Sequence, residues 1–285
     1  MITLVFWNLR GRPLDALLAA VCKTAIDMGK SKEDTDYILC CATESGRIDR
    51  STIQQKFGAL MPGTTWRVFG AAPFVFVTNI PASLRTMEEY RHRACYFGFK
   101  HGFGNFLASF VHLSSPMGSW SPTESQAVKA NKVREKLVDC EGRLTCDAVA
   151  IGDFNADPFS LAMISADGMH ATMCRTIAAK GERRLGADDS ERVGYFYNLM
   201  WRHYGDATPD RTPGTFYRSH REDALYWHAL DQVLVRPSHI DSVVNTNTVV
   251  TKAGVVDLLS GGRIDNDISD HLPITVTLDL KGHSK

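Results

Sequence analysis

Short apolar runs alternate with amphipathic stretches along the chain. Residues 2–8 and residues 37–43 are apolar and rich in β-branched and aromatic residues, which predicts two buried strands. Between them, apolar side chains recur at helical spacing, which predicts a helix that opens at Pro13. The members of this apolar stripe are Leu14, Leu17, Leu18, Val21 and Cys22. The chain therefore opens as strand, helix and strand.

The middle of the chain predicts a run of short strands between two helices. The first helix spans residues 51–60, with Ser51 as its N-cap, and the second spans residues 122–140 and is amphipathic. Glycine, proline and asparagine separate the strands in between, as in an antiparallel meander. These strands are expected at residues 66–69, 74–78, 94–99 and 105–113, and a further buried strand is expected at 148–151.

The pattern weakens over residues 159–221, where we expect loops and one helix around residues 195–204. Strands at 230–235, 243–249 and 272–280 close the chain. Internal repeats and obvious linkers are absent from the sequence. We therefore expect one domain over residues 1–285, with a two-layer β core flanked by helices.

Length and composition exclude disordered and fibrous classes, because 285 residues with 44% apolar content can bury a large core. The sequence contains neither a long apolar run nor an N-terminal leader, so we expect a cytoplasmic protein without membrane association. Its seven cysteines are odd in number, include the pair at 40–41 and form no C-x-x-C motif. We interpret them as buried small apolar residues rather than as disulfides or a zinc site.

The net charge is zero, with 32 basic and 32 acidic residues, so the overall charge does not indicate any class of binding partner. The zero is a cancellation, because residues 1–150 carry 18 basic and 14 acidic residues, and residues 151–285 carry 14 basic and 18 acidic residues. The position of the acidic residues in the chain is therefore more informative than the net charge.

Eight polar residues stand at or near the ends of predicted strands, where α/β proteins commonly build their sites. Taken singly, each has an ordinary explanation as a turn residue, a solvated strand end, a cap or a satisfied core histidine. They are Asn8, Glu44, His112, Asp153, Asn155, Asp231, Asp270 and His271.

The combination of these residue types favours phosphodiester chemistry. Oxygen ligands from Asn, Glu and Asp suit Mg²⁺ or Mn²⁺, and a protonated histidine can stabilise charge that develops on phosphorus. Hydrolysis of a phosphodiester needs an activated water, neutralised phosphate oxygens and a stabilised leaving group, and this set can supply all three.

Six blocks of sequence, in chain order, resemble the signature motifs of the endonuclease/exonuclease/phosphatase superfamily. They are Phe6-Trp-Asn-Leu-Arg10, Ala42-Thr-Glu44, Phe110-Val-His-Leu113, Ile151-Gly-Asp-Phe-Asn-Ala-Asp157, Leu230-Asp-Gln-Val-Leu234 and Ser269-Asp-His-Leu-Pro-Ile274. The superfamily includes pancreatic deoxyribonuclease, exonuclease III, abasic-site endonucleases, neutral sphingomyelinases, deadenylases and inositol-polyphosphate 5-phosphatases. The resemblance implies an α/β fold, namely a four-layer α/β/β/α sandwich of two face-to-face mixed sheets flanked by helices, with the site at one rim.

The same resemblance implies a metal site and a water-activating group. Asn8, Glu44 and Asp270 would hold or neighbour the divalent metal, Mg²⁺ or Mn²⁺. Asp153 would orient or deprotonate the attacking water.

Two histidines and their neighbours complete the implied machinery. His271 would contact a non-bridging phosphate oxygen or act as the base, with Asp231 fixing its tautomer. His112 would assist protonation of the leaving group, and Asn155 would hydrogen-bond the scissile phosphate or the nucleophile. Whether Asp153 or His271 activates water stays open at this point.

Three positions depart from the superfamily pattern. Thr43 stands where glutamine is frequent, and Gln232 stands where aromatic residues are frequent; neither changes the implied roles. Asn79 stands where arginine is frequent, which removes the usual partner of an auxiliary acid found in the deoxyribonuclease branch.

The leading hypothesis is a Mg²⁺-dependent phosphodiesterase that acts on nucleic acid, with DNA favoured, as an endonuclease or exonuclease. Twenty of the 32 basic residues are arginine, which suits bidentate phosphate contacts. Arginines and aromatic residues that could grip phosphates and stack on bases gather in the connecting segments, although solvated helix faces and aromatic core explain them equally well. They include Arg91, Arg93, Arg183, Arg184, Arg202, Arg218 and Arg221, with Trp201, Tyr217, Tyr226 and Trp227 nearby.

Two alternatives compete with the nuclease hypothesis. One is a phosphoesterase for a small or lipid-linked phosphate, such as an inositol phosphate, a nucleotide or sphingomyelin. The other is a non-catalytic binding module, which predicts eroded metal ligands, whereas every acidic, Asn and His position of the set is retained.

Overall fold

The computed structural model describes residues 1–12, 15–29, 37–45, 49–60, 62–91, 93–102, 104–115, 125–186, 190–204, 212–218, 224–244 and 248–280. The chain divides into two compact units, each built from separate segments. The first unit is Met1–Ser83, His203–Asp231 and Val243–Lys285, and the second is Leu84–Arg202 and Gln232–Ser242. The expected single domain over residues 1–285 stays a prediction.

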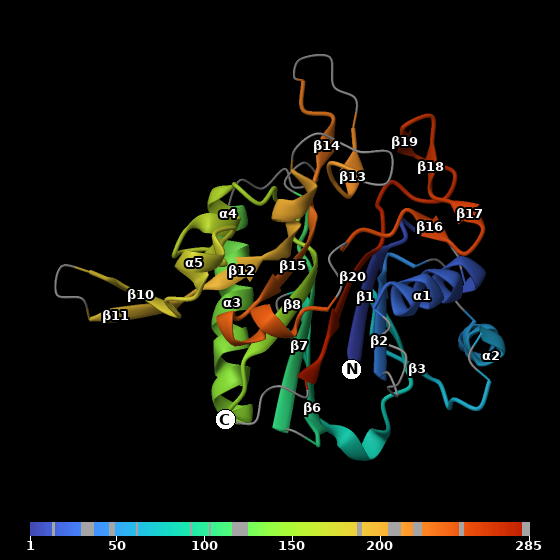
Figure 1. The fold of residues 1–285 in the computed structure, drawn as a ribbon, viewed down its shortest axis with the longest axis horizontal. Coiled ribbons are helices and arrows are strands. Elements are labelled where there is room, and N and C mark those ends of the chain that lie inside the picture. The colour runs from blue at the N-terminus through green and yellow to red at the C-terminus, as the bar shows by residue number, and fades with distance from the viewer. Residues whose placement is uncertain are drawn as a thin grey trace. The chain divides into compact units, whose positions relative to one another are not determined.

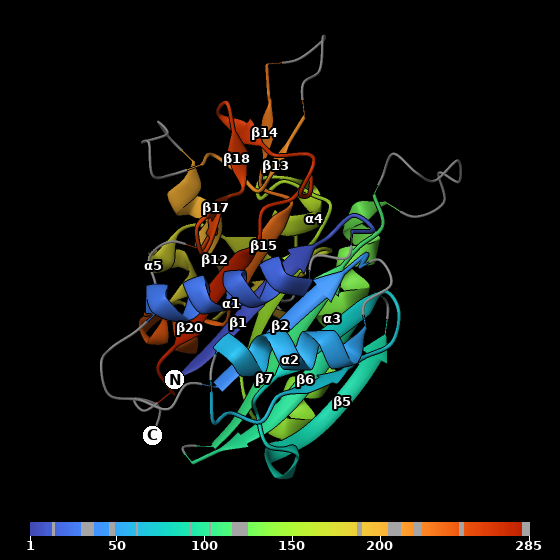
Figure 2. The ribbon, with the colours of Figure 1, turned by 90° about the vertical axis from the view of Figure 1, so that its right-hand side faces the viewer.

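A five-stranded mixed sheet forms the core of the first unit (Figure 2). Its strand order is β20-β1-β2-β4-β3, with β1 parallel to β2 and the other neighbours antiparallel. Helices α1 and α2 lie side by side along one face of this sheet. The bounds are β1 Ile2–Asn8, α1 Asp15–Gly29, β2 Tyr37–Thr43, α2 Arg50–Leu60, β3 Arg67–Phe69, β4 Phe74–Thr78 and β20 Ile274–Leu278.

Three small antiparallel ladders also belong to the first unit. They are β13 Phe216–Tyr217 with β14 Trp227–His228, β16 Lys252–Ala253 with β17 Val256–Asp257, and β18 Leu259–Ser260 with β19 Arg263–Ile264. A 3₁₀ turn, η1, spans Ala82–Leu84 at the boundary of the two units.

A seven-stranded mixed sheet forms the core of the second unit, with strand order β5-β6-β7-β8-β15-β12-β9. Helix α3 packs against β6 and β7 (Figure 1). The strands are β5 Arg85–Arg91, β6 Ala94–His101, β7 Gly104–His112, β8 Ala148–Asp153, β9 Ala171–Thr172, β12 Phe196–Asn198 and β15 Asp231–Val235. The remaining elements are α3 Gln126–Leu144, α4 Leu161–Ile164, α5 Arg175–Ala178, η2 Leu199–His203, η3 Pro237–Ser242 and the ladder of β10 Glu182–Leu185 with β11 Glu191–Gly194.

The most apolar predicted strands are confirmed because burial on both faces demands a continuous apolar run. Every residue of β1, β8 and β15 is buried, as are all residues of β2 after Tyr37. The α/β class with two mixed sheets and flanking helices is therefore confirmed, and these are the parts expected of the sandwich. Five of the seven cysteines are buried, as predicted, whereas Cys146 is half-buried and Cys174 is exposed.

The expected helix over residues 195–204 is wrong. Strand β12 occupies its first part, because Tyr197 and Asn198 pair with Val235 and Leu234 of β15, and only a 3₁₀ turn follows. The expected strand at 243–249 is also wrong over its described part, where Val243 and Val249 form single bridges to β20; residues 245–247 lie outside the described chain.

The expected meander is divided between the two units. Strands β3 and β4 pair in the first sheet, whereas β6 and β7 pair in the second. Strand β5 has no counterpart among the expected strands, because its sequence RTMEEYR is polar and only partly buried.

The predicted N-cap of α2 is wrong by two residues. The helix begins at Arg50, and Asp49 accepts hydrogen bonds from the backbone N–H and hydroxyl of Ser51 and from the hydroxyl of Thr52. These hydrogen bonds, chiefly the one from the Ser51 side chain, lower the pKa of Asp49 to about 2. The start of α1 at Pro13 and of α3 at residues 122–124 lies outside the described chain. Among the described helices, none has the length and apolarity needed to cross a membrane.

Candidate active site

In the first unit, two predicted metal ligands stand at the carboxyl ends of neighbouring parallel strands. Asn8 is the last residue of β1 and is paired in register with Thr43, the last residue of β2, so that Glu44 follows directly beside it. The backbone N–H of Leu9 donates to the carbonyl of Thr43 at 2.9 Å, which holds the two strand ends together. Asn8 is buried and Glu44 is exposed, so an amide oxygen and a carboxylate border the same strand ends.

Asp270 joins these residues through its neighbour Ser269. The hydroxyl of Ser269 donates to the carbonyl of Asn8 at 2.8 Å, which fixes the segment before β20 against the end of β1. One carboxylate oxygen of Asp270, Oδ2, lies 3.2 Å from the guanidinium of Arg10. The other, Oδ1, is buried and has no hydrogen-bond partner among the described residues.

A buried carboxylate oxygen without a hydrogen bond is costly unless a cation or another donor satisfies it. Asn8, Glu44 and Asp270 together supply amide and carboxylate oxygens, the ligands that Mg²⁺ and Mn²⁺ prefer. The residues present in the first unit therefore fit a hard divalent metal.

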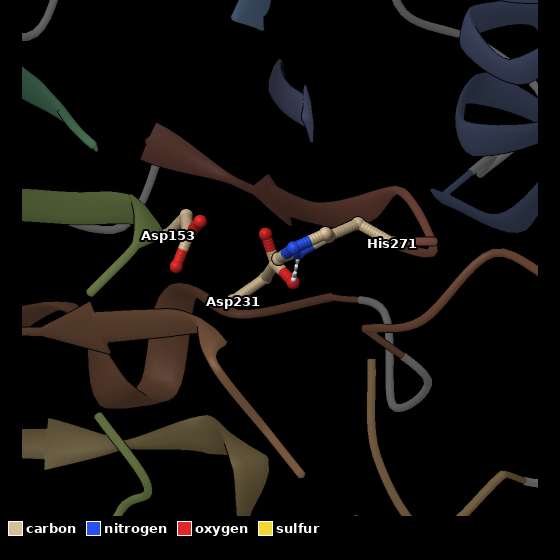
Figure 3. A group of neighbouring side chains, drawn as sticks. All are labelled: Asp153, Asp231 and His271. Atoms are coloured by element: carbon tan, nitrogen blue, oxygen red, sulfur yellow. Dashed lines mark hydrogen bonds and ion pairs between the residues drawn. The ribbon is translucent and has the colours of Figure 1, made fainter. Parts of the chain in front are cut away.

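A buried acid–histidine pair lies in the same unit. Nδ1 of His271 donates to Oδ2 of Asp231 at 2.7 Å; the side chains are 8% and 0% exposed (Figure 3). An ionised carboxylate can only accept, so this bond places a ring proton on Nδ1. Figure 3 also draws Asp153, which belongs to the second unit.

Three residues that the sequence did not single out position this pair. The indole Nε1 of Trp7 donates to the carbonyl of His271 at 2.9 Å. The hydroxyl of Thr215 accepts from the backbone N–H of Asp231 at 3.0 Å, and the ring of Phe216 lies 4.9 Å from the His271 ring. Both members of the pair are thus held by backbone and ring contacts, which fixes their geometry.

In the second unit, His112 and Asp153 end the parallel strands β7 and β8 and are paired in register. Nε2 of His112 lies 3.9 Å from Oδ2 of Asp153, and both side chains are buried. This separation allows an ion pair when the imidazole is protonated.

Asn155 folds back on Asp153. Its backbone N–H donates to Oδ1 of Asp153 at 2.8 Å, and its side-chain Nδ2 contacts Oδ2 of Asp153 at 3.0 Å and the carbonyl of Leu113 at 2.7 Å. These bonds fix both oxygens of the carboxylate, so the loop after β8 presents Asp153 in one orientation.

Gly152 allows β8 to approach β7 closely just before Asp153. Its φ is +152°, and a Cβ atom there would lie 2.0 Å from the carbonyl oxygen of Val111. Only glycine fits without a backbone shift, which explains the glycine of the Gly-Asp-Phe-Asn motif.

Gln232, whose departure from the superfamily pattern leaves the implied roles unchanged, connects three elements of the second unit. Its amide donates to the carbonyl of Ala156 in the loop after β8 and accepts from Asn198 of β12 at 2.7 Å. Gln232 therefore supports the loop that carries Asp153 and Asn155. No sequence signal could reveal this, because the contacts join positions far apart in the chain.

Three residues at or beside the predicted site have left-handed backbone conformations: Arg10 with φ 47°, Glu44 with φ 48° and Asn155 with φ 47°. For residues other than glycine this conformation costs roughly 1–3 kcal/mol and gathers at functional sites. Asparagine tolerates it best, so the strain is greatest at Arg10 and Glu44.

The predicted site residues thus fall into two sets. The first unit brings together Asn8, Glu44, Asp231, Asp270 and His271, and the second brings together His112, Asp153 and Asn155. Arg91, Arg93, Arg183 and Arg184 lie exposed on the second unit, whereas the side chain of Arg202 and all of Arg221 fall outside the described chain. The roles of all these residues stay predictions.

Solved structures share this fold over nearly the whole chain. A mannosyl-6-phosphatase from Bacteroides thetaiotaomicron matches with a TM-score of 0.53 and 14% identity, covering 98% of this chain and 100% of that one. An AP endonuclease from Archaeoglobus fulgidus matches with a TM-score of 0.51 and 12% identity, covering 98% and 100%. An endonuclease/exonuclease/phosphatase family protein, also from Bacteroides thetaiotaomicron, matches with a TM-score of 0.50 and 14% identity, covering 96% of each chain.

No protein-family model matches the sequence, and no curated protein matches it. At these low identities the likeness is one of fold. The structural resemblance to endonuclease/exonuclease/phosphatase proteins, expected from the six sequence blocks, is confirmed at that level.

Proposed function

We propose that the protein is a divalent-metal-dependent phosphodiesterase. The observation that carries this proposal is the buried Asp231–His271 pair in the same unit as Asp270, whose Oδ1 is buried without a hydrogen-bond partner among the described residues. Hydrolysis of a phosphodiester requires a group that stabilises developing charge and a metal ion that neutralises the phosphate. A positioned imidazole can do the first, and a carboxylate oxygen that is open to a metal ion can help to hold the second.

In this proposal Asn8, Glu44 and Asp270 hold Mg²⁺ or Mn²⁺. The bound metal would neutralise negative charge on the phosphate oxygens. His271 donates from Nε2 to a non-bridging oxygen, while Asp231 stabilises the protonated imidazole through Nδ1.

The second unit supplies the proton-transfer groups, and we propose that both sets act on one phosphate. Asp153 accepts the proton of the attacking water, held in place by the two hydrogen bonds from Asn155. His112 gives a proton to the leaving oxygen, and Asn155 also contacts the phosphate. The joint action of the two sets rests on the order of the sequence blocks, which follows the superfamily pattern.

Nucleic acid is the substrate that we favour, and DNA before RNA. Arginine makes up 20 of the 32 basic residues, and the guanidinium of Arg263 lies 5.5 Å from the centre of the Tyr217 ring. The AP endonuclease among the structural matches is consistent with this substrate.

A small phosphate ester is the second candidate, favoured by the match to a mannosyl-6-phosphatase. Substrate choice in one fold is made by loops, so a shared fold does not decide between the two. A non-catalytic module is disfavoured, because every predicted acidic, Asn and His position is retained.

A substrate panel tests the proposal. Plasmid, single-stranded DNA, RNA, abasic duplex, a sugar phosphate, inositol phosphates and sphingomyelin are incubated with Mg²⁺ or Mn²⁺, each with an EDTA control. We expect metal-dependent cleavage of the DNA substrates. Cleavage confined to the last three would replace the nuclease proposal by the second candidate, and no cleavage of any substrate would contradict both.

A further inference from the structure

The ladder of β13 and β14 projects from the first unit beyond the end of its large sheet (Figure 1). Phe216 is paired with His228, and Tyr217 is paired with Trp227. A ladder with two residues in each strand is marginal by itself, so side-chain contacts must hold it.

The base of this ladder is attached to the Asp231–His271 pair. Phe216 forms a backbone bridge to His271, and their rings lie 4.9 Å apart. Thr215, one residue earlier, accepts from the backbone N–H of Asp231 through its hydroxyl and from the backbone N–H of Leu272 through its carbonyl. Tyr217 directly follows Phe216, so the outer part of the ladder adjoins the residues that contact the pair.

The outer part of the ladder is an aromatic cluster. The Tyr217 ring meets the Trp227 ring edge-on at 5.2 Å and stacks on the Tyr226 ring at 6.1 Å with an interplanar angle of 15°. The guanidinium of Arg263, from β19, lies 5.5 Å from the centre of the Tyr217 ring. Tyr217 is thus surrounded by two rings and one cation.

Tyr226 differs from the other two rings because it is held in place and yet remains open to solvent. It is 43% exposed, whereas Tyr217 and Trp227 are half-buried. The cross-strand pair of Tyr217 and Trp227 already stabilises the ladder, so the exposure of a third ring adds little to folding. A ring that is fixed by stacking and open to solvent is a ready surface for a planar ligand.

We propose that Tyr226, supported by Tyr217 and by the cation of Arg263, is a stacking site for a nucleobase of the substrate. This inference rests on the proposed phosphodiesterase function and names its substrate class. Every base has a flat π face, so such a site accepts bases without regard to sequence. A positive guanidinium beside the stack suits a base that carries a phosphate.

Binding measured without catalysis tests this proposal separately from the proposed function. Two fluorescein-labelled oligomers of equal length and charge are compared in EDTA, one of oligothymidylate and one of base-free tetrahydrofuran phosphodiesters. The wild-type protein is expected to prefer the base-bearing oligomer. In Tyr226→Ala the ratio of the two affinities should fall about tenfold, in line with the usual worth of one stacked base.

Two further variants control for changes in the fold. Tyr226→Phe keeps the ring and should keep the affinity ratio, and Leu225→Ala removes the neighbouring exposed side chain, which has no ring, and should also keep it. Equal binding of both oligomers by the wild-type protein, binding of neither, or the same ratio in Tyr226→Ala would overturn the proposal.

Mononucleotides and polynucleotides both carry nucleobases, so a competition experiment is needed to distinguish them as ligands. If thymidine dinucleotide displaces the labelled oligomer as well as an unlabelled oligomer does, the ligand is a small nucleotide; if it does not, the ligand is a polynucleotide. A loss of sugar-phosphate hydrolysis in Tyr226→Ala with an unchanged base preference would assign the ring to a sugar instead and overturn the proposal.

Discussion

Nδ1 of His271 donates to Oδ2 of Asp231 across 2.7 Å, inside a buried setting built by Trp7, Thr215 and Phe216. This bond fixes which nitrogen of His271 carries a proton, and the contacts of its neighbours fix where the ring lies. It ties two residues 40 positions apart in the chain into one functional group.

Replacement of Asp231 by asparagine should lower kcat by about 10²-fold or more and leave KM nearly unchanged. The carboxamide keeps the size of the side chain but loses the charge that stabilises protonated His271. Steady-state kinetics on the cleaved substrate measures this, and circular dichroism checks the fold. In a His271→Ala background, Asp231→Asn should lower kcat only slightly further. If kcat instead falls by the full factor seen in the single variant, Asp231 does not act through His271.

The metal site can be tested by binding alone. Asp270→Asn should weaken Mn²⁺ binding at least about tenfold, because the buried Oδ1 would be lost as a charged ligand while Arg10 lost its ion pair. Titration of Mn²⁺ followed by electron paramagnetic resonance measures the affinity. Asp257→Asn, at an exposed carboxylate of the same unit, is the control and should bind as the wild type does. Equal Mn²⁺ affinity in Asp270→Asn would remove Asp270 from the site.

Gly152→Ala should lower the free energy of unfolding by about 2–4 kcal/mol, because the added Cβ would collide with the carbonyl of Val111 at a positive φ. Gly142→Ala is the matched control. Gly142 lies in α3, and a Cβ atom added there would meet no neighbouring atom within 4 Å, so alanine should raise the free energy of unfolding by up to about 1 kcal/mol. Urea titration measures both, and a Gly152→Ala protein as stable as the wild type would show that β7 and β8 can move apart.

Acid should destabilise the second unit through His170. Burial is the largest cause that lowers the pKa of this imidazole below its usual value of about 6.5, while Tyr195 stacks on the ring at 4.4 Å. The unfolded chain then binds the proton more readily than the folded one, so the contribution of His170 is complete above about pH 6.5 and is lost as pH falls below it.

The variant His170→Asn isolates this effect, because asparagine tolerates the φ of 52° at this position. Its free energy of unfolding should fall less than that of the wild type between pH 7.5 and pH 5.5. Identical pH dependence in both proteins would remove His170 as the cause.

The sequence predicts elements well where burial alone decides them. The apolar runs of β1, β2 and β8 and the amphipathic pattern of α3 are sufficient to assign these elements, because each must hide an apolar surface. Strand β5 escapes prediction because pairing with β6, rather than an apolar run, makes it a strand. The expected helix at 195–204 fails because partners distant in sequence convert its first residues into β12.

The candidate site also contains residues that the sequence identifies and residues that only the structure identifies. Residues such as Asp153 and His271 can be identified from motifs, since their chemistry and order are visible in the sequence. The supports of the site cannot, because Gln232 and Thr215 act through contacts made only in the folded chain. Arg10 is a further case, since its ion pair with Asp270 depends on a left-handed turn after β1.

The most direct test of the central claim is a double-mutant cycle between the two units. Activity is measured with Mg²⁺ for the wild type, Asp153→Asn, His271→Gln and the double variant, on the substrate that the panel selects. If both residues serve one site, each single variant should lose about 10²-fold or more, and the double variant should lose far less than the product of the two. Full activity in either single variant, or losses that multiply completely, would contradict the account.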